Sequence, residues 1–202
     1  MNRRIEEIIS TLHGTISAAR KEVLQPLSEY IKAKKNQNRT IRLNFICTHN
    51  SRRSHLSQIW AQTMAFHFDI RNVFCYSGGT EATAMFPKVA QTLADQGFDV
   101  RMLSQNENPV YAVKYDQNEA PVICFSKVYS NDFNPKGDFG AVMTCSSADE
   151  GCPVVFGAEA RFPIRYNDPK EFDGTALQTQ KYADCSLEIA NEMFWIFNAV
   201  CN

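Results

Sequence analysis

The stretch Ile41-Arg42-Leu43-Asn44-Phe45-Ile46 runs directly into Cys47-Thr48-His49-Asn50-Ser51-Arg52-Arg53-Ser54. The first six residues predict a short apolar strand, and the next eight predict a polar loop that leads into a helix. A loop of this length can curl until its backbone N–H groups point inward, where the positive end of the following helix adds to them. These groups favour a thiolate and a bound tetrahedral oxyanion. The stretch therefore predicts an oxyanion-binding loop with Cys47 as its nucleophile.

Side chains within this loop support the same prediction. The planar guanidinium of Arg53 can bind two oxygens of one anion, which a lysine cannot do. The Ser54 hydroxyl can hydrogen-bond the Cys47 sulfur, and Asn50 tolerates the left-handed backbone conformation that such a loop requires. Residues 54–61 then have the apolar spacing of an amphipathic helix. The alternative is a buried strand-end cysteine beside two solvated arginines, and the flanking strand and helix argue against it.

Strand-like and helix-like segments alternate beyond residue 40. In chain order they are strand 41–46, helix 53–68, strand 73–77, helix 86–96, strands 121–125 and 141–145, and helix 182–200. This alternation is typical of an α/β fold with a mainly parallel sheet covered on both faces. Ligands of such folds bind at the carboxyl ends of the strands, where Cys47 lies. Residues 127–139 predict a long polar loop.

The N-terminal part has a different pattern. Residues 3–34 carry apolar side chains at three- and four-residue spacing, which predicts an amphipathic helical segment that Gly14 and Pro26 break or kink. We therefore divide the chain into an N-terminal helical extension with its linker at 1–40 and an α/β domain at 41–202. The extension either packs on its own domain or serves as an arm for a homodimer.

The composition excludes several classes of function. Lys and Arg number 21 against 22 Asp and Glu, and the formal charge of −1 gives no overall field for nucleic acid or an anionic membrane. The sequence has no signal-peptide pattern and no apolar run of about 18 residues, so we expect a cytoplasmic protein. The four histidines show no metal-ligand spacing, so we expect no metal site and no cofactor.

Seven cysteines in a reducing compartment favour redox or catalytic use over lasting disulfides. Four of them are predicted to be core residues because they lie in or beside apolar segments: Cys75, Cys124, Cys185 and Cys201.

The remaining pair, Cys145 and Cys152, follows the last predicted strand. Because parallel strands end at one edge of the sheet, Cys145 can approach Cys47. In a regular helix the two α-carbons of the pair would be roughly 10 Å apart, whereas a disulfide needs about 4.4 to 6.8 Å. Gly151 and Pro153 would permit the segment to loop. The alternative is two unrelated small core residues.

Asp168 lies in the Asn167-Asp168-Pro169 segment before the C-terminal helix. A carboxylic acid beside the loop could protonate a leaving oxygen, which a thiolate, backbone amides and an arginine cannot do. Asp-Pro is also a common turn, and composition alone favours the turn.

These motifs together resemble the low-molecular-weight protein tyrosine phosphatase superfamily. The resemblance rests on Cys47–Ser54, on Ser77-Gly78-Gly79-Thr80-Glu81 and on Asn167–Pro169, and it covers residue 41 to the C-terminus. Within that superfamily, Thr144–Pro153 is similar to the redox segment of the thioredoxin-coupled arsenate reductases, which plain phosphatases lack. The implied fold is a three-layer α/β/α arrangement with a four-stranded parallel sheet, as in phosphotyrosine phosphatase I, and 41–202 is the phosphatase/arsenate reductase-like domain.

The resemblance also implies roles for single residues. Cys47 would be the nucleophile, Arg53 the transition-state clamp and Asp168 the general acid. Asn50 and Ser77 would hold the loop in shape. The residues that would bind the substrate are Thr48, His49, Asn50, Ser51, Arg52 and Ser54.

The same resemblance implies a cysteine relay. Cys145 would attack Cys47 after arsenate has bonded to its sulfur, arsenite would leave, and Cys152 would then attack Cys145. A thioredoxin-like partner would reduce the final disulfide. Relatives of the reductase type usually carry a further cysteine where this chain has Arg52.

Three functions follow from this comparison of motifs. The first is a cytosolic arsenate reductase that acts on arsenate with an external thiol reductant. The second is a phosphatase for phosphomonoesters, although Lys170 and Glu171 stand where phosphotyrosine enzymes usually have an aromatic residue. The third is a non-catalytic redox-sensing or anion-binding module.

Overall fold

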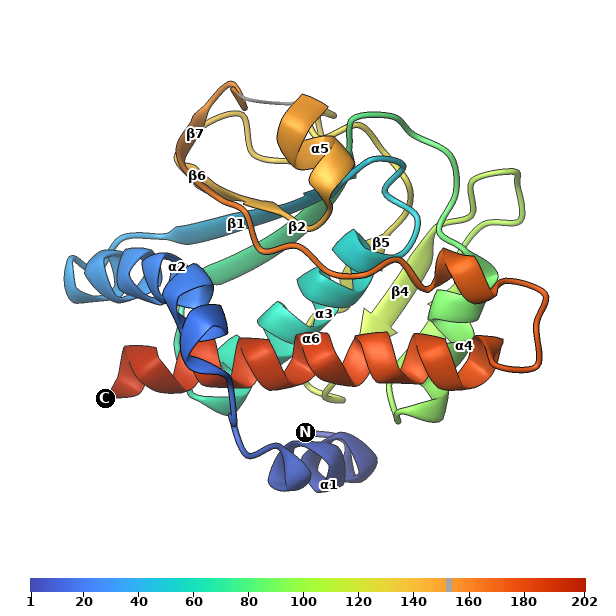
Figure 1. The fold of residues 1–202 in the computed structure, drawn as a ribbon, viewed down its shortest axis with the longest axis horizontal. Coiled ribbons are helices and arrows are strands. Elements are labelled where there is room, and N and C mark those ends of the chain that lie inside the picture. The colour runs from blue at the N-terminus through green and yellow to red at the C-terminus, as the bar shows by residue number, and fades with distance from the viewer. Residues whose placement is uncertain (152–153) are drawn as a thin grey trace.

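The main sheet of the computed structural model has four strands (Figure 1). They are β1 (Ile41–Cys47), β2 (Val73–Gly79), β6 (Phe139–Met143) and β7 (Ala158–Phe162), in the spatial order β2-β1-β6-β7. Each neighbouring pair is parallel. The structure describes residues 1–151 and 154–202. The predicted four-stranded parallel sheet is confirmed.

Helices cover both faces of this sheet, as the alternation predicts. One face is covered by α2 (Ala18–Asn36), α3 (Arg53–His67) and α6 (Gln178–Cys201), and the short α5 (Ser146–Gly151) lies on the other face (Figure 1). The remaining helices are α1 (Arg3–Thr11), α4 (Pro87–Asp95) and the 3-10 helix η1 (Pro169–Phe172). None of the described helices is both long and apolar enough to cross a membrane.

Two strand predictions need correction. The segment near 121–125 forms β5 (Val122–Cys124), but β5 belongs to a separate antiparallel sheet with β3 (Asp99–Met102) and β4 (Tyr111–Lys114). The fourth strand of the main sheet is β7, which the sequence does not reveal. As a short edge strand with partly exposed residues, β7 lacks the continuous apolar run of a buried parallel strand.

The N-terminal helices pack on the main core. Ile5 of α1 and Leu24, Leu27 and Ile31 of α2 are fully buried in one cluster with residues of α3 and α6. Their apolar faces are thus covered within this chain, so the homodimer arm and the boundary at residue 40 remain predictions without support.

The two predicted helix breaks have different outcomes. Gly14 lies between α1 and α2 at a φ of 56°, and the break there is confirmed. Pro26 lies inside α2, which runs unbroken from Ala18 to Asn36, so a break at Pro26 is excluded and the alternative, a kink, stays a prediction.

The strand register sets the position of the candidate site. In the β1–β2 pair Cys47 is opposite Gly79, and in the β1–β6 pair Ile46 is opposite Met143. Cys145 follows Met143 by two residues and therefore emerges at the same edge as Cys47. Both cysteines belong to a smaller buried cluster on the α5 face of the sheet.

Candidate active site

The loop between β1 and α3 has the shape that the sequence predicts. Asn50 adopts a φ of 44°, which turns the chain in the left-handed sense. Within the described part of the chain, no residue accepts a hydrogen bond from the backbone N–H groups of 48–53. These donors and the N-terminus of α3 are therefore available to a bound anion.

Ser54 and Asn50 hold the Cys47 side chain by a short chain of polar contacts. The Cys47 sulfur lies 3.1 Å from the Ser54 hydroxyl oxygen, which confirms the predicted contact. That oxygen accepts a hydrogen bond from the Asn50 side-chain amide at 2.9 Å. Because the oxygen already accepts from Asn50, its own hydrogen is free to point at the sulfur.

His55 supports the loop from behind, and sequence reasoning misses it. Its Nε2 lies 2.8 Å from the Asn50 carbonyl oxygen, and its Nδ1 lies 3.2 Å from the Ser77 hydroxyl. Complete burial lowers the pKa of His55 to about 3, so the ring is neutral. A carbonyl only accepts, so Nε2 carries the hydrogen and Nδ1 accepts from Ser77. Ser77 thus reaches the loop through His55.

Residues 126 and 127 form hydrogen bonds with the other side of the loop. The Lys127 backbone N–H donates to the Asn50 side-chain oxygen at 3.0 Å, and the Ser126 hydroxyl donates to the His49 carbonyl at 2.9 Å. Lys127 is the first residue of the predicted polar loop 127–139, and Ser126 lies just before it. The sequence offers no local signal for their role, because more than 70 residues separate them from the oxyanion loop.

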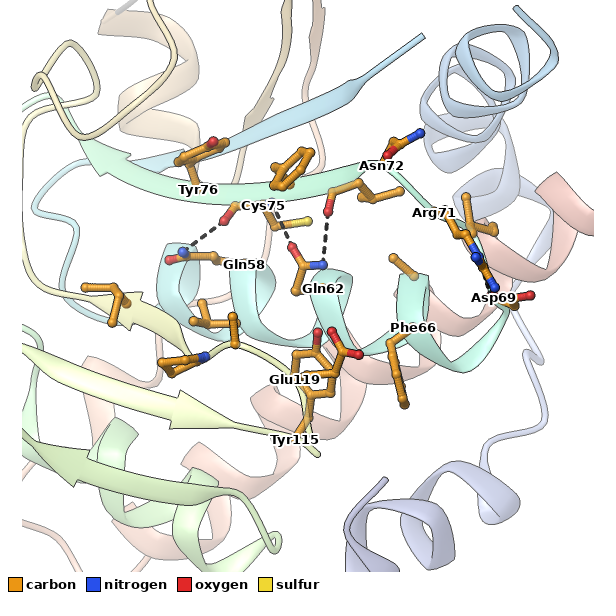
Figure 2. Close-up of a pocket in the computed structure, with 18 of the residues that line it drawn as sticks. Gln58, Gln62, Phe66, Asp69, Arg71, Asn72, Cys75, Tyr76, Tyr115 and Glu119 are labelled. Carbon is orange, nitrogen blue, oxygen red and sulfur yellow. Dashed lines mark hydrogen bonds and ion pairs between the residues drawn. The ribbon is translucent and has the colours of Figure 1, made fainter. Parts of the chain in front are cut away.

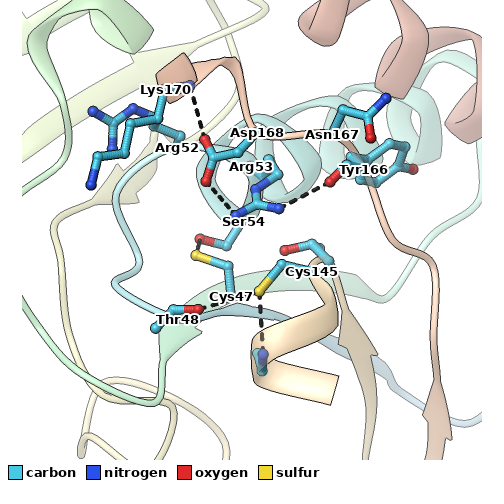
Figure 3. Close-up of polar contacts among 12 residues, drawn as sticks. Cys47, Thr48, Arg52, Arg53, Ser54, Cys145, Tyr166, Asn167, Asp168 and Lys170 are labelled. Carbon is cyan, nitrogen blue, oxygen red and sulfur yellow. Dashed lines mark hydrogen bonds and ion pairs between the residues drawn. The ribbon is translucent and has the colours of Figure 1, made fainter. Parts of the chain in front are cut away.

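Arg53 and Asp168 face the loop together (Figure 3). The guanidinium of Arg53 donates to Asp168 Oδ2 at 2.5 Å and to the Tyr166 carbonyl at 2.9 Å. The other carboxylate oxygen of Asp168 accepts from the Lys170 backbone N–H at 3.1 Å. The segment around Asp168 therefore forms a turn and also places the Asp168 carboxylate beside the loop.

Cys145 lies at the loop next to Thr48. Its sulfur is 3.4 Å from the Thr48 hydroxyl oxygen, and it accepts a hydrogen bond from the Ala148 backbone N–H at 3.4 Å (Figure 3). The tertiary structure thus brings together Cys47 and Cys145, which are far apart in the sequence. Cys152, the third cysteine of the predicted relay, lies outside the described residues.

The outer residues of the loop have contacts of other kinds. The His49 imidazole is half exposed and lies 3.6 Å from the Glu81 carboxylate at the mouth of the loop. Ser51 is buried, and its carbonyl accepts from the Phe86 N–H at 3.0 Å. The carbonyl of Thr48 accepts from the Glu81 N–H at 2.8 Å. The substrate-binding role of these residues remains a prediction.

Comparison with known proteins agrees with this geometry. No family model matches the sequence. Over 125 residues, which are 62% of this chain and 76% of the relative, it is 28% identical to arsenate reductase 2 of Staphylococcus epidermidis. A low molecular weight phosphotyrosine phosphatase from Vibrio cholerae O395 has a TM-score of 0.53 at 14% identity, over 78% of this chain and 95% of that chain. The chain has the low-molecular-weight phosphatase fold.

A second solved structure supports the same fold. The low molecular weight protein tyrosine phosphatase from T. tengcongensis has a TM-score of 0.55 at 14% identity, over 79% of this chain and 99% of that chain. The predicted resemblance is therefore confirmed for the fold by the two phosphatase structures and for the sequence by the arsenate reductase relative.

Within this phosphatase fold, Arg52 binds the segment that carries Asp168. Its Nε donates to the Tyr182 hydroxyl at 2.6 Å, and its guanidinium donates to Asp173 at 2.6 Å and lies 4.1 Å from the centre of the Phe86 ring. Any contact between Arg52 and an anion would therefore come from its backbone N–H.

Two arginines anchor α5, the helix that follows Cys145. The Asp149 side chain is only 5% exposed and forms ion pairs with Arg161 of β7 and with Arg165. Arg165 Nε lies 2.7 Å from the Asp149 carboxylate. These pairs attach the part of α5 near Cys145 to the edge of the main sheet.

A separate cavity of about 800 Å³ lies between α3, the free edge of β2 and the β4–β5 hairpin (Figure 2). Gln62 donates to the Val73 carbonyl at 3.1 Å and accepts from the Cys75 N–H at 3.0 Å, and Gln58 donates to the Cys75 carbonyl at 3.0 Å. These two side chains thus form hydrogen bonds with the backbone groups at the free edge of β2. No residue of 47–54 lines this cavity.

The other cysteines mostly behave as predicted. Cys75, Cys124 and Cys185 are buried, and burial raises the pKa of each thiol, to about 12 for Cys124 and Cys185. Cys201 is exposed, so its prediction as a core residue is wrong: the last turn of α6 extends past the core.

Proposed function

We propose that this chain is an arsenate reductase in which Cys47 is the nucleophile and Cys145 the second nucleophile. The observation that best supports the proposal is the 3.4 Å contact between the Cys145 sulfur and the hydroxyl of Thr48, the first residue of the oxyanion loop. A plain phosphatase reaction needs one thiol at this loop, whereas reduction of arsenate needs two. The similarity to arsenate reductase 2 of Staphylococcus epidermidis points the same way.

In the first step, arsenate binds to the loop N–H groups and to Arg53. The Cys47 thiolate attacks arsenic, and a hydroxyl group of arsenate leaves as water after it takes a proton from Asp168. A sulfur–arsenic(V) bond forms and an arsenic–oxygen bond breaks. Ser54 orients the thiolate for this attack, since its hydroxyl contacts the sulfur.

In the second step, the Cys145 thiolate attacks the Cys47 sulfur. The sulfur–arsenic bond breaks, its electron pair goes to arsenic, and arsenic(III) leaves as arsenite. The two thiols are oxidised to a Cys47–Cys145 disulfide, which balances the two electrons that arsenic gains. The Ala148 N–H donates to the Cys145 sulfur and holds it beside the loop.

Cys152 then attacks Cys145 and releases Cys47, and a thioredoxin-like dithiol reduces the Cys145–Cys152 disulfide. This relay needs reduced thiols between turnovers, which fits a cytoplasmic location.

The second candidate is hydrolysis of phosphomonoesters through a phosphocysteine. The Arg53–Asp168 pair beside Cys47 favours it, because this reaction needs only the nucleophile, the clamp and the acid. The third candidate, a redox-sensing or anion-binding module, would keep the loop without turnover.

The deciding experiment measures arsenate reduction with a dithiol donor and hydrolysis of p-nitrophenyl phosphate on the same preparations. We expect Cys145→Ser to abolish multiple-turnover reduction and to leave hydrolysis largely intact. Cys75→Ser is the control, because Cys75 is a buried cysteine of β2 that lines the separate cavity. Wild-type protein that hydrolyses the ester but reduces no arsenate would favour the phosphatase. Absence of both activities would favour the third candidate.

A further inference from the structure

Lys127 is a buried lysine that has no acidic partner in the described part of the chain. Its side chain is among the largest that are fully buried, and its Nζ donates to the Phe125 carbonyl at 3.2 Å. The ammonium lies 4.4 Å from the centre of the Phe125 ring and 5.4 Å from that of Phe133. Among the described residues, no carboxylate forms an ion pair with it.

The backbone of Lys127 lies directly behind the oxyanion loop. Its N–H donates to the Asn50 side chain at 3.0 Å, and its carbonyl accepts from the Gly79 N–H at 2.9 Å. The titratable groups that face its ammonium are His55 of α3 and Cys124 of β5, and both are neutral. The charge of Lys127 is therefore uncompensated on the protein side of the loop.

Keeping this charge buried is unfavourable for folding. Burial disfavours the ammonium and lowers the pKa of Lys127 to about 8. An apolar side chain of similar size would avoid the desolvation penalty, since buried charges are often replaced by apolar residues without loss of stability. The charge therefore calls for a reason other than stability.

We propose that Lys127 serves as a built-in cation behind the oxyanion loop, and that its positive charge strengthens the binding of a tetrahedral oxyanion on the opposite side of that loop. The inference rests on the oxyanion site of the proposed function. Lys127 supports binding through its electric field, whereas the loop N–H groups and Arg53 make the contacts. In a protein medium a unit charge behind the loop is worth roughly three- to tenfold in affinity.

The direction of the pH effect follows from this assignment. Below about pH 8 the ammonium is charged and assists the anion, and above it the neutral amine no longer does. Because the unfolded lysine keeps its proton up to about pH 10.4, rising pH in this interval removes a charge that opposes folding. Stability from this group therefore increases with pH over the interval, while anion affinity falls.

The test compares Lys127→Met with its parent in a Cys47→Ser background, which removes titration of the nucleophile. Calorimetry measures the binding of sulfate, whose charge does not change over this range, at about pH 6.5 and about pH 9.5. We expect Lys127→Met to weaken sulfate binding roughly three- to tenfold at the lower pH and to have no effect at the higher one. Its melting temperature at the lower pH should equal or exceed that of the parent.

Lys34→Met is the matched control, because Lys34 is buried too but is paired with Glu159 at the far side of the fold. It should leave sulfate affinity unchanged. If Lys127→Met does not fold, a second measurement on the parent alone tests the inference. A bound anion favours the charged form of Lys127, so sulfate binding near pH 8 should be accompanied by proton uptake.

Equal sulfate affinity of Lys127→Met and parent at about pH 6.5 would overturn the inference. An equal loss of sulfate affinity at both pH values would also overturn it, because such a loss indicates damage to the loop. In the measurement on the parent alone, sulfate binding without proton uptake would likewise overturn the inference. A parent that binds none of sulfate, phosphate and arsenate would overturn the oxyanion site itself.

Discussion

The Arg53 guanidinium and the Asp168 carboxylate form an ion pair at 2.5 Å directly over the loop that holds Cys47. Both side chains are only partly exposed, and Arg53 Nε is buried without a hydrogen-bond partner among the described residues. An oxyanion that binds Arg53 must compete with Asp168. Substrate binding would therefore release the Asp168 carboxylate from Arg53.

Asp168→Asn tests the acid. A proton matters when the leaving group is a poor one and matters little when it is already stable as an anion. We expect turnover of phenyl phosphate to fall about 10²- to 10³-fold and that of p-nitrophenyl phosphate by less than about tenfold. Steady-state kinetics on both esters measures the difference. Equal losses on the two esters would show that Asp168 only shapes the turn.

Arg52→Met tests the link between the loop and the acid segment. Arg52 holds Asp173, which ends the short η1 helix that follows Asp168, so its loss should let the acid move. We expect kcat for poor leaving groups to fall about 3- to 30-fold with little change in KM, since positioning errors of this kind slow the chemical step.

The exposed Arg71, whose ion pair lies away from the loop, provides the matched control as Arg71→Met. Arg52→Met and Asp173→Asn should also be non-additive in a double-mutant cycle. Additive effects, or a change confined to KM, would argue for a direct substrate contact by Arg52.

Gly79→Ala tests how closely β2 approaches the loop. A Cβ at this position would lie 2.6 Å from the Thr48 carbonyl oxygen and 2.8 Å from the Asn50 nitrogen, so the loop backbone must shift. A shift of about 1 Å can cost roughly 10²-fold in rate, and we expect a loss of that order in turnover and a weaker affinity for phosphate.

Gly137→Ala is the natural control, since a Cβ there meets no atom within 4 Å. It should retain wild-type kinetics. Full activity of Gly79→Ala would mean that the loop tolerates displacement and that its backbone geometry is not what binds the anion.

Cys152→Ser tests the end of the relay. In this variant no thiol at position 152 can attack the Cys47–Cys145 disulfide. Arsenate should therefore trap that disulfide, with about one arsenite released per chain. Peptide mass mapping under non-reducing conditions identifies the linkage. A trapped disulfide between Cys47 and any other cysteine would assign the second nucleophile elsewhere.

The sequence by itself determined the parts of this protein that are local. The loop from Cys47 to Ser54 is one contiguous segment whose shape follows from an apolar strand, an asparagine that tolerates a positive φ and a helix start. The strands β1, β2 and β6 are visible for the same reason, because most of their residues are apolar and buried.

Only the tertiary structure decided which distant groups serve that loop. The contact between Thr48 and Cys145 depends on the parallel β1–β6 register, and the Arg52–Asp173 pair depends on how η1 packs against α6. His55 looks like any residue of an amphipathic helix, and its role appears only when Ser77 and Asn50 lie at its two nitrogens. Hydrogen bonds and electric fields act through space, so a sequence pattern reveals them only where the interacting residues are also neighbours along the chain.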